Sequence, residues 1–221
     1  MLIQQNVRND LYKFGWITIS ADPSLTLTQY ASELGKPVPS QRDSGLIDLL
    51  KPKTIDQARK TSLSGQYGLG AFPFHTDNAH KRIPPHYVLL RLVGVTDEVS
   101  PTLLHDIKNI GLSGSDFARL RRDVWIVNGG LGVFTSTIIN SKSTAHTEIV
   151  RYDPICMRPA HKNFGKSAEI LYGACDRFSP IKIQWHYGLL LIIDNWRILH
   201  SRPVLSYLYD EQRILERCLV A

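Results

Sequence analysis

The sequence predicts a mainly β protein with flanking helices, most simply a double-stranded β-helix, which is also called a jelly roll. Many short apolar stretches are bounded by turn residues, and few stretches have helical periodicity. The polar residues with chemical potential lie far apart, near positions 76 and 200, and a jelly roll can bring such residues to one cavity mouth. With 221 residues the chain can bury a substantial core, so we expect residues 1–221 to form a single domain.

The N-terminal part of the chain predicts two helices and two strands. A short helical stretch from residue 7 leads into a strand over 15–19. Residues 24–34 carry an apolar stripe of helical period, and Gly35 is placed to end that helix. A loop rich in proline and glycine then precedes a short strand at 46–50.

Residues 51–70 are polar and glycine-rich, and they lead into a strand that contains His75. Two interpretations fit this composition: a solvated connector, or a lid that closes over a substrate. The two are compatible, and the sequence does not choose between them.

The rest of the chain predicts more strands than helices. Ser113 and Asp116 have the spacing of a capping box that opens a helix. Residues 131–150 alternate only loosely between polar and apolar. We expect strands at 87–95, 102–107, 124–127, 181–185, 189–193 and 213–220, and helices at 113–122 and 165–175.

Composition argues for a soluble cytoplasmic protein without nucleic-acid partners. The net charge is +6, but the basic residues are scattered, and their densest cluster, 119–122, is interrupted by Leu120 and reads as a solvated helix face. A basic balance also suits an enzyme with carboxylate ligands. The longest apolar run, 189–193, is too short for a membrane span, and the N-terminus lacks the features of a secretion signal.

The three cysteines, Cys156, Cys175 and Cys218, form no CxxC motif and are odd in number. We therefore expect reduced, packed thiols and neither a zinc site nor a disulfide framework.

A metal site is the leading functional hypothesis. His75 and Asp77 are two residues apart, so on an extended strand their side chains leave from one face. Two ligands bind a metal weakly, and His200, just beyond the apolar run 189–193, is our candidate for the third. Two imidazoles and one carboxylate form the facial triad of non-haem Fe(II) oxygenases, which leaves coordination positions open.

The remaining histidines match no ligand position, and we expect them to be surface residues or satisfied core residues. They are His80, His86, His105, His146, His161 and His186.

Several motifs resemble the taurine dioxygenase and clavaminate synthase-like family of Fe(II)- and 2-oxoglutarate-dependent oxygenases. The resemblance runs from about residue 35 to the C-terminus, in matching order and spacing. The motifs are Ser62-Leu63-Ser64, Phe72-Pro73-Phe74-His75-Thr76-Asp77, Pro84-Pro85-His86-Tyr87-Val88-Leu89-Leu90, Trp185-His186-Tyr187-Gly188, Asp194-Asn195-Trp196-Arg197 and His200-Ser201-Arg202.

The resemblance implies a role for several residues. His75, Asp77 and His200 correspond to the iron ligands. Thr102 falls where a threonine hydroxyl meets the distal carboxylate of 2-oxoglutarate, and Arg213 falls where an arginine pairs with that carboxylate. A guanidinium fork suits this task because it can bind a carboxylate at two places.

Arg217 lies four residues beyond Arg213, so on a strand it shares the same face. In relatives this position borders the 2-oxoglutarate pocket or contacts an anionic group of the substrate. The segment between Asp77 and His200 holds 122 residues, which is short for the family and puts the size of the active-site cover in question.

The resemblance therefore implies an Fe(II)- and 2-oxoglutarate-dependent dioxygenase that uses O₂ and releases succinate and CO₂. It would oxidise, and most simply hydroxylate, a C–H bond of a small molecule such as an amino acid or another carboxylate. Two alternatives remain open at this stage: a catalytically silent relative that binds metal or ligand, and a nucleic-acid-directed oxygenase. The oligomeric state is not encoded in any motif.

Overall fold

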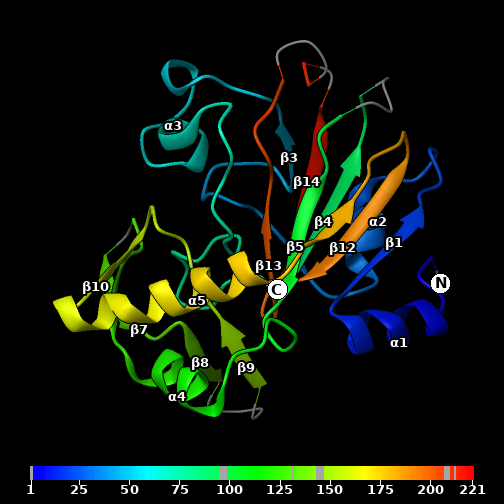
Figure 1. Ribbon diagram of the computed structural model, residues 1–221. Helices are drawn as coiled ribbons and strands as arrows, with labels where there is room; N and C mark the ends of the chain where they lie inside the picture. Colours follow the sequence, from blue (N-terminus) through cyan, green and yellow to red (C-terminus); the bar gives the residue numbers. More distant parts are fainter. Residues whose placement is uncertain (1, 95–98, 131, 143–146, 207–209, 212) are drawn as a thin grey trace.

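The computed structural model describes residues 2–94, 99–130, 132–142, 147–206, 210–211 and 213–221. Strands form most of its regular structure, and the helices lie around them (Figure 1). The strands are β1 (Trp16–Ser20), β2 (Pro37–Val38), β3 (Ile47–Leu50), β4 (Tyr87–Leu92), β5 (Thr102–Asp106), β6 (Trp125–Asn128), β7 (Val133–Ser136), β8 (Ile139–Lys142), β9 (Thr147–Val150), β10 (Met157–Pro159), β11 (Ile181–Ile183), β12 (Leu189–Asp194), β13 (Ile198–Ser201) and β14 (Leu215–Val220). The helices are α1 (Gln5–Phe14), α2 (Leu27–Ser32), α3 (Leu63–Tyr67), α4 (Gly114–Arg122) and α5 (Lys166–Arg177), with 3₁₀ turns η1 (Ile55–Gln57) and η2 (Lys162–Gly165).

The largest sheet has the strand order β1-β12-β4-β14-β2, and β3 also pairs with β14. Every neighbouring pair in it is antiparallel. A smaller antiparallel sheet, β11-β5-β13, packs against one face of it through shared core residues. Two facing antiparallel sheets of this kind confirm the predicted double-stranded β-helix.

The central strand β12 shows why this part of the sequence is apolar throughout. Leu191 and Ile193 face the smaller sheet, whereas Leu190 and Ile192 face the opposite side. That opposite side is covered by α1 and α2, which lie together at one side of the molecule (Figure 1). A strand that is buried on both faces reads as a continuous apolar run.

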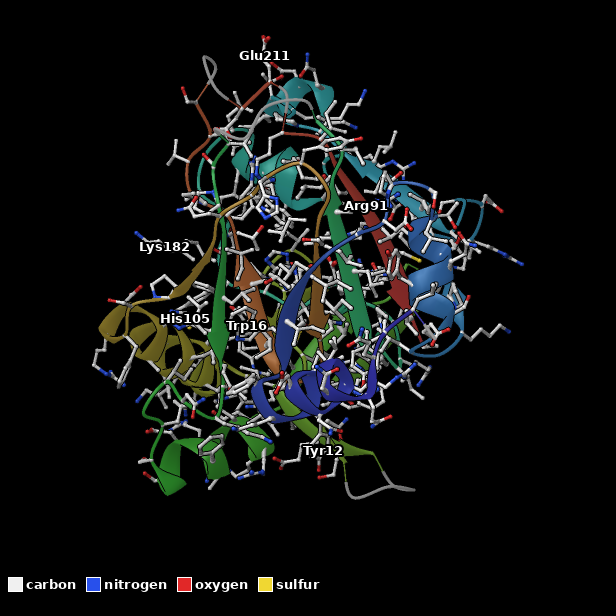
Figure 2. The ribbon with its side chains drawn as sticks, turned by 90° about the vertical axis from the view of Figure 1, so that its right-hand side faces the viewer. Tyr12, Trp16, Arg91, His105, Lys182 and Glu211 are labelled. Atoms are coloured by element: carbon white, nitrogen blue, oxygen red, sulfur yellow. The ribbon has the colours of Figure 1, made fainter. Side chains whose placement is uncertain are left out.

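Helices α4 and α5 lie at the other side of the molecule, beside the β10-β6-β7 sheet and the β8-β9 pair (Figure 1). They enclose a second core with these strands. In the smaller sheet, His105 of β5 faces α5 (Figure 2), and its ring is buried. Tyr12 of α1 points in contrast into solvent, with 90% of its surface exposed (Figure 2).

Most expected elements are confirmed, some shorter than expected, such as α2 and β4, and others longer, such as α5 and β12. The capping box at Ser113 and Asp116 opens α4 as predicted. Residues 37–38 form a strand instead of a loop, and 51–70, expected as a solvated connector or a lid, contain η1 and α3. Within the loosely alternating stretch 131–150, the described residues form β7, β8 and β9.

Some sequence predictions fall outside the described residues, namely the end of the 87–95 strand at Val95 and the histidine at His146. Among the described residues, no helix has both the length and the apolar character needed to cross a membrane.

Candidate metal centre

His75 and His200 are joined through their backbones. The His75 N–H donates to the His200 carbonyl and the His200 N–H donates to the His75 carbonyl, both at 3.0 Å. His200 lies on β13, whose pairing with β5 places it opposite Leu104. The two ring centroids are 4.4 Å apart. The pairing of His75 with His200 therefore brings the two imidazole rings side by side.

The sequence placed His75 and Asp77 on a strand, and that detail is wrong. His75 forms only an isolated bridge with His200, and a turn begins at Asp77. Asn78 has a φ of 53°, a left-handed conformation that asparagine tolerates better than most residues. The side chains still alternate over these three residues: His75 and Asp77 point to the candidate metal centre, whereas Thr76 lies between them and its N–H donates to the Tyr152 carbonyl.

Asn195 fixes the backbone of Asp77. Its Oδ1 accepts from the Asp77 N–H at 2.8 Å, and its Nδ2 donates to the Asp77 carbonyl at 3.0 Å and to Pro85 at 2.9 Å. Asn195 is fully buried in the turn between β12 and β13. The same turn that leads to His200 thus also anchors Asp77.

The donor atoms of His75, Asp77 and His200 all lie within 4.8 Å of one another, and the three residues are buried. The His75 Nδ1 contacts the Pro73 carbonyl at 2.9 Å, which leaves Nε2 for a ligand. The His200 Nε2 lies 4.0 Å from Asp77 Oδ2. Among the described residues no other such group is found.

The charge states of this cluster suit a cation. Burial and the neighbouring His75 lower the pKa of His200 to about 3, so its imidazole is neutral. Burial opposes ionisation of Asp77, but Arg217 and the two imidazoles outweigh it and lower the pKa of this carboxyl group. A neutral imidazole and an ionised carboxylate are the forms that bind metal. The donor set therefore fits a divalent transition metal such as Fe(II).

Arg217 supports Asp77 from the side opposite His200. Its Nη1 donates to Asp77 Oδ1 at 2.9 Å, and its Nη2 and Nε donate to Asp48 Oδ2 at 2.9 and 3.2 Å. Arg217 and Asp48 are register partners on β14 and β3. Burial lowers the Arg217 pKa, but the two carboxylates more than compensate and raise it. Asp48 was missed by the sequence analysis because only strand pairing brings it here.

Arg213 and Thr102 meet near one end of β5. The Arg213 Nη2 donates to Thr102 Oγ1 at 3.2 Å and its Nε donates to the Ser100 carbonyl at 2.8 Å. Trp185 Nε1 donates to the same hydroxyl at 3.1 Å. Arg213 precedes β14 instead of lying on it, and it contacts different partners from Arg217.

Arg213 is a buried cation without a carboxylate partner among the described residues. Asp210, the acidic residue whose charge acts on Arg213, uses its carboxylate oxygens for Ser100 and Ser206. Among the described residues, no acceptor is found for Arg213 Nη1. Burial lowers the Arg213 pKa to about 10. Because an unpaired buried charge is costly, this position suits an anionic ligand.

Arg202 ties the segment around α3 to the metal centre. Its guanidinium lies 3.7 Å from the ring centroid of Phe72 and donates to the carbonyls of Gly68 and Gly70. The Phe72 N–H in turn donates to the Arg202 carbonyl at 3.0 Å. The C-terminal part of the 51–70 region is therefore anchored two residues after His200.

The other described histidines lie outside the cluster, as expected. All three cysteines are free thiols. Burial raises the pKa of Cys175 to about 12 and that of Cys218 to about 11, so both are packed, unreactive groups.

Solved structures with this fold include several oxygenases. No known family model matches the sequence, and no curated protein matches it. An asparagine oxygenase in complex with Fe(II), (2S,3S)-3-hydroxyasparagine and succinate aligns with a TM-score of 0.73 at 18% identity, over 98% of this chain and 79% of the other. The non-haem iron oxygenase OrfP, with Fe and α-ketoglutaric acid, aligns at 0.72 and 18% identity over 99% and 80%. The PvcB protein from Pseudomonas aeruginosa aligns at 0.67 and 14% identity over 98% and 79%. This chain therefore has the double-stranded β-helix fold that these proteins share.

Proposed function

We propose that this protein is an Fe(II)- and 2-oxoglutarate-dependent dioxygenase that oxidises a C–H bond of a small molecule, with release of succinate and CO₂. The observation that carries this proposal is the convergence of His75, Asp77 and His200 on one buried spot. Two imidazoles and one carboxylate are the ligand set of the non-haem Fe(II) facial triad.

The residues of the proposed centre would have separate roles. His75, Asp77 and His200 would hold the metal, and Arg217 would keep Asp77 oriented through the oxygen that does not face His200. Bound Fe(II) would supply the dioxygen chemistry that side chains cannot perform. The protein itself provides orientation and a site with little access to bulk water, because the three ligands are buried.

Arg213 and Thr102 would bind the distal carboxylate of 2-oxoglutarate. Arg213 offers a buried guanidinium without a carboxylate partner in the described residues, and Thr102 offers a hydroxyl that Trp185 and Arg213 already orient. Hydrogen bonds from a charged donor to a carboxylate are about twice as strong as neutral ones.

The substrate class proposed is an amino acid or a related small carboxylate. The asparagine oxygenase structure contains a hydroxylated asparagine and succinate, and OrfP structures contain hydroxylated arginine. These are properties of those proteins. They support the same class of substrate here because the fold is shared over nearly the whole chain.

The test begins without substrate. Fe(II)-loaded protein is mixed with 2-oxoglutarate in the absence of oxygen, and the weak visible charge-transfer band of the complex is recorded. We expect the band in the wild type, and we expect the His75→Ala variant to lack it because a ligand is gone. His186→Ala, which removes an exposed imidazole, serves as the matched control and should keep the band.

A wild-type protein without the band would contradict the proposal, as would a His75→Ala variant that retains it. Oxygen-dependent release of succinate then separates an enzyme from a protein that only binds the metal and the keto acid.

A further inference from the structure

A pocket of about 630 Å³ lies beside the metal centre, and none of the residues discussed so far as ligands lines it. Its walls come from residues 38–42, from residues 80–82 and from the connection between β6 and β7, with Phe134 as an aromatic surface. This volume lies within the range of small-molecule sites, which is about 300–1,000 Å³.

Hydrogen bonds connect the wall of the pocket to the metal ligand Asp77. Ser40 lines the pocket and donates from Oγ to Asp48 Oδ1 at 2.9 Å, and Asp48 is the partner of Arg217. The Ser40 carbonyl accepts from Asn78 Nδ2 at 3.1 Å. His80 is only three residues after Asp77, so the two Cα atoms lie within roughly 11 Å of each other.

The pocket is strongly basic. Arg42, Lys81 and Arg82 line it, and no carboxylate is among the described residues that do so. Lys81 donates from Nζ to the Pro39 carbonyl at 2.7 Å, and none of the three cations has a carboxylate partner in the described part of the chain.

Several arginines outside the pocket are instead paired with carboxylates. Arg91 is paired with Glu216 and Arg121 with Glu148, both at 2.6 Å. A concave site lined by one sign of charge concentrates ligands of the opposite sign.

The basic wall is held by a buried arginine. Arg151, with 2% of its surface exposed, donates to the carbonyls of Ala79, Lys81 and Arg82. These carbonyl oxygens therefore point toward Arg151, which does not line the pocket. The guanidinium groups of Arg82 and Arg151 each lie 5.3 Å from the ring centroid of Phe134, so the ring also helps to place Arg82.

The opposite wall requires a glycine at position 129. A Cβ there would lie 2.9 Å from the Gly132 carbonyl oxygen and 3.1 Å from that of His80. Only glycine allows the β6–β7 connection to approach the basic segment this closely. Close backbone contacts at Gly129 and around Arg151 therefore shape both sides of the pocket.

We propose that this pocket receives a second acidic group, a carboxylate or a phosphate, which the substrate carries in addition to the α-carboxylate of an amino acid. The inference rests on the proposed function and narrows its substrate class to molecules with such a group. Lys81 and Arg82 would bind the anion, and Arg42 would add charge at the rim, where its side chain is exposed.

Calorimetric titration tests the proposal with matched pairs of probes that differ in charge. The protein is first loaded with Mn(II) and then with 2-oxoglutarate, and each binding step is recorded. The probes are L-aspartate against L-asparagine, L-glutamate against L-glutamine, and O-phospho-L-serine against L-serine. The first two pairs report a carboxylate site, and the third reports a phosphate site.

The key variant is Lys81→Gln/Arg82→Gln. Its control is Lys182→Gln/Arg158→Gln, which removes the same charge from two exposed positions outside the pocket; Lys182 projects from the edge of the smaller sheet (Figure 2). Thermal melting of both variants, compared with the wild type, shows whether each is folded.

We expect at least one acidic probe to bind about tenfold tighter than its neutral partner, which corresponds to about 1.4 kcal/mol. The preference should persist in the control and disappear in the pocket variant. No acidic preference in the wild type, or a preference that survives in a folded pocket variant, would overturn the proposal. Failure of the Mn(II) or 2-oxoglutarate step would instead count against the proposed function, so the two failures are distinguishable.

Discussion

Arg217 donates a 2.9 Å hydrogen bond from Nη1 to Oδ1 of Asp77, on the side of the carboxylate away from His200. The other side of the guanidinium is occupied by Asp48. One cation thus lies between two carboxylates, and only one of these belongs to the proposed metal centre. This arrangement keeps the charge next to the ligand balanced and leaves a single oxygen of Asp77 facing the imidazoles.

The Asp48→Asn variant should weaken metal binding by about tenfold, since residues that orient metal ligands typically contribute 10- to 100-fold to affinity. Without the Asp48 charge, the positive charge of Arg217 opposes a cation more strongly. Mn(II) affinity, measured from the electron paramagnetic resonance signal of the free ion, checks this. Asp10→Asn, at an exposed position of α1, should leave the affinity unchanged. Equal affinities in the two variants would show that the Asp48 charge does not influence the proposed metal centre.

The Arg213→Lys variant should bind 2-oxoglutarate about 10- to 100-fold more weakly. Lysine keeps the charge but loses the planar fork that reaches both Thr102 and the Ser100 carbonyl, and a hydrogen bond to a charged group contributes about 1.5–3 kcal/mol. Calorimetric titration of the Mn(II)-loaded protein measures this directly. Arg158→Lys, at an exposed arginine, is the control. Unchanged affinity for 2-oxoglutarate in Arg213→Lys would place the keto acid elsewhere.

Asp194 should make the protein less stable as the pH rises. Burial raises the pKa of Asp194 to about 6, although the hydrogen bond from the Trp196 N–H lowers it in part. The folded state therefore binds the proton more tightly than the unfolded state, so the free energy of unfolding falls as the pH rises from about 4 to about 6 and then stays level. Asn resembles the protonated acid and can still accept from Trp196.

Asp194→Asn should consequently gain about 1–3 kcal/mol relative to the wild type above pH 6, with a smaller gain near pH 4. Urea unfolding at a series of pH values measures the difference. His86, whose Nε2 lies 3.5 Å from Asp194, works against this trend while it is protonated. A gain that is independent of pH would mean that Asp194 does not titrate in this range.

Gly65→Ala should destabilise the protein by about 1–3 kcal/mol, the usual cost of forcing atoms into a packed site. A Cβ at Gly65 would lie 1.9 Å from the Arg59 carbonyl oxygen, so α3 could no longer pack against the preceding turn. Gly173→Ala is the opposite case, because its Cβ would meet only Arg177 Nη1, at 3.7 Å, within α5. That variant should gain up to about 1 kcal/mol from helix propensity, and thermal unfolding distinguishes the two.

The sequence predicted the parts of the fold that depend on local pattern. The apolar run 189–193 identified β12, because a strand buried on both faces needs no polar positions. The stretch 131–150 did not reveal its strands, because β7 is largely exposed and its alternation is therefore weak. The predicted strand at His75 failed because the extended backbone there ends after Thr76, and a turn begins at Asp77.

The cluster of His75, Asp77 and His200 was predictable because two of its members are close in sequence and the third follows a clear strand. Asp48 was not, since its position beside Arg217 depends on the register of β3 against β14. The basic pocket could not be predicted either, because Arg42 and Lys81 are far apart in sequence and only the fold brings them to one pocket. Local sequence reports ligand types, whereas charge clusters across strands appear only after the sheets have formed.

The reciprocal backbone hydrogen bonds between His75 and His200 bear on the order in which the chain folds and binds metal. These bonds bring two distant stretches of polypeptide into register before the imidazoles can share an ion, so at the proposed metal centre folding would come before metal binding. Those hydrogen bonds join backbone groups and need no metal. If the proposed metal is lost, we therefore expect the two segments to stay paired, so that the centre could be reloaded without refolding.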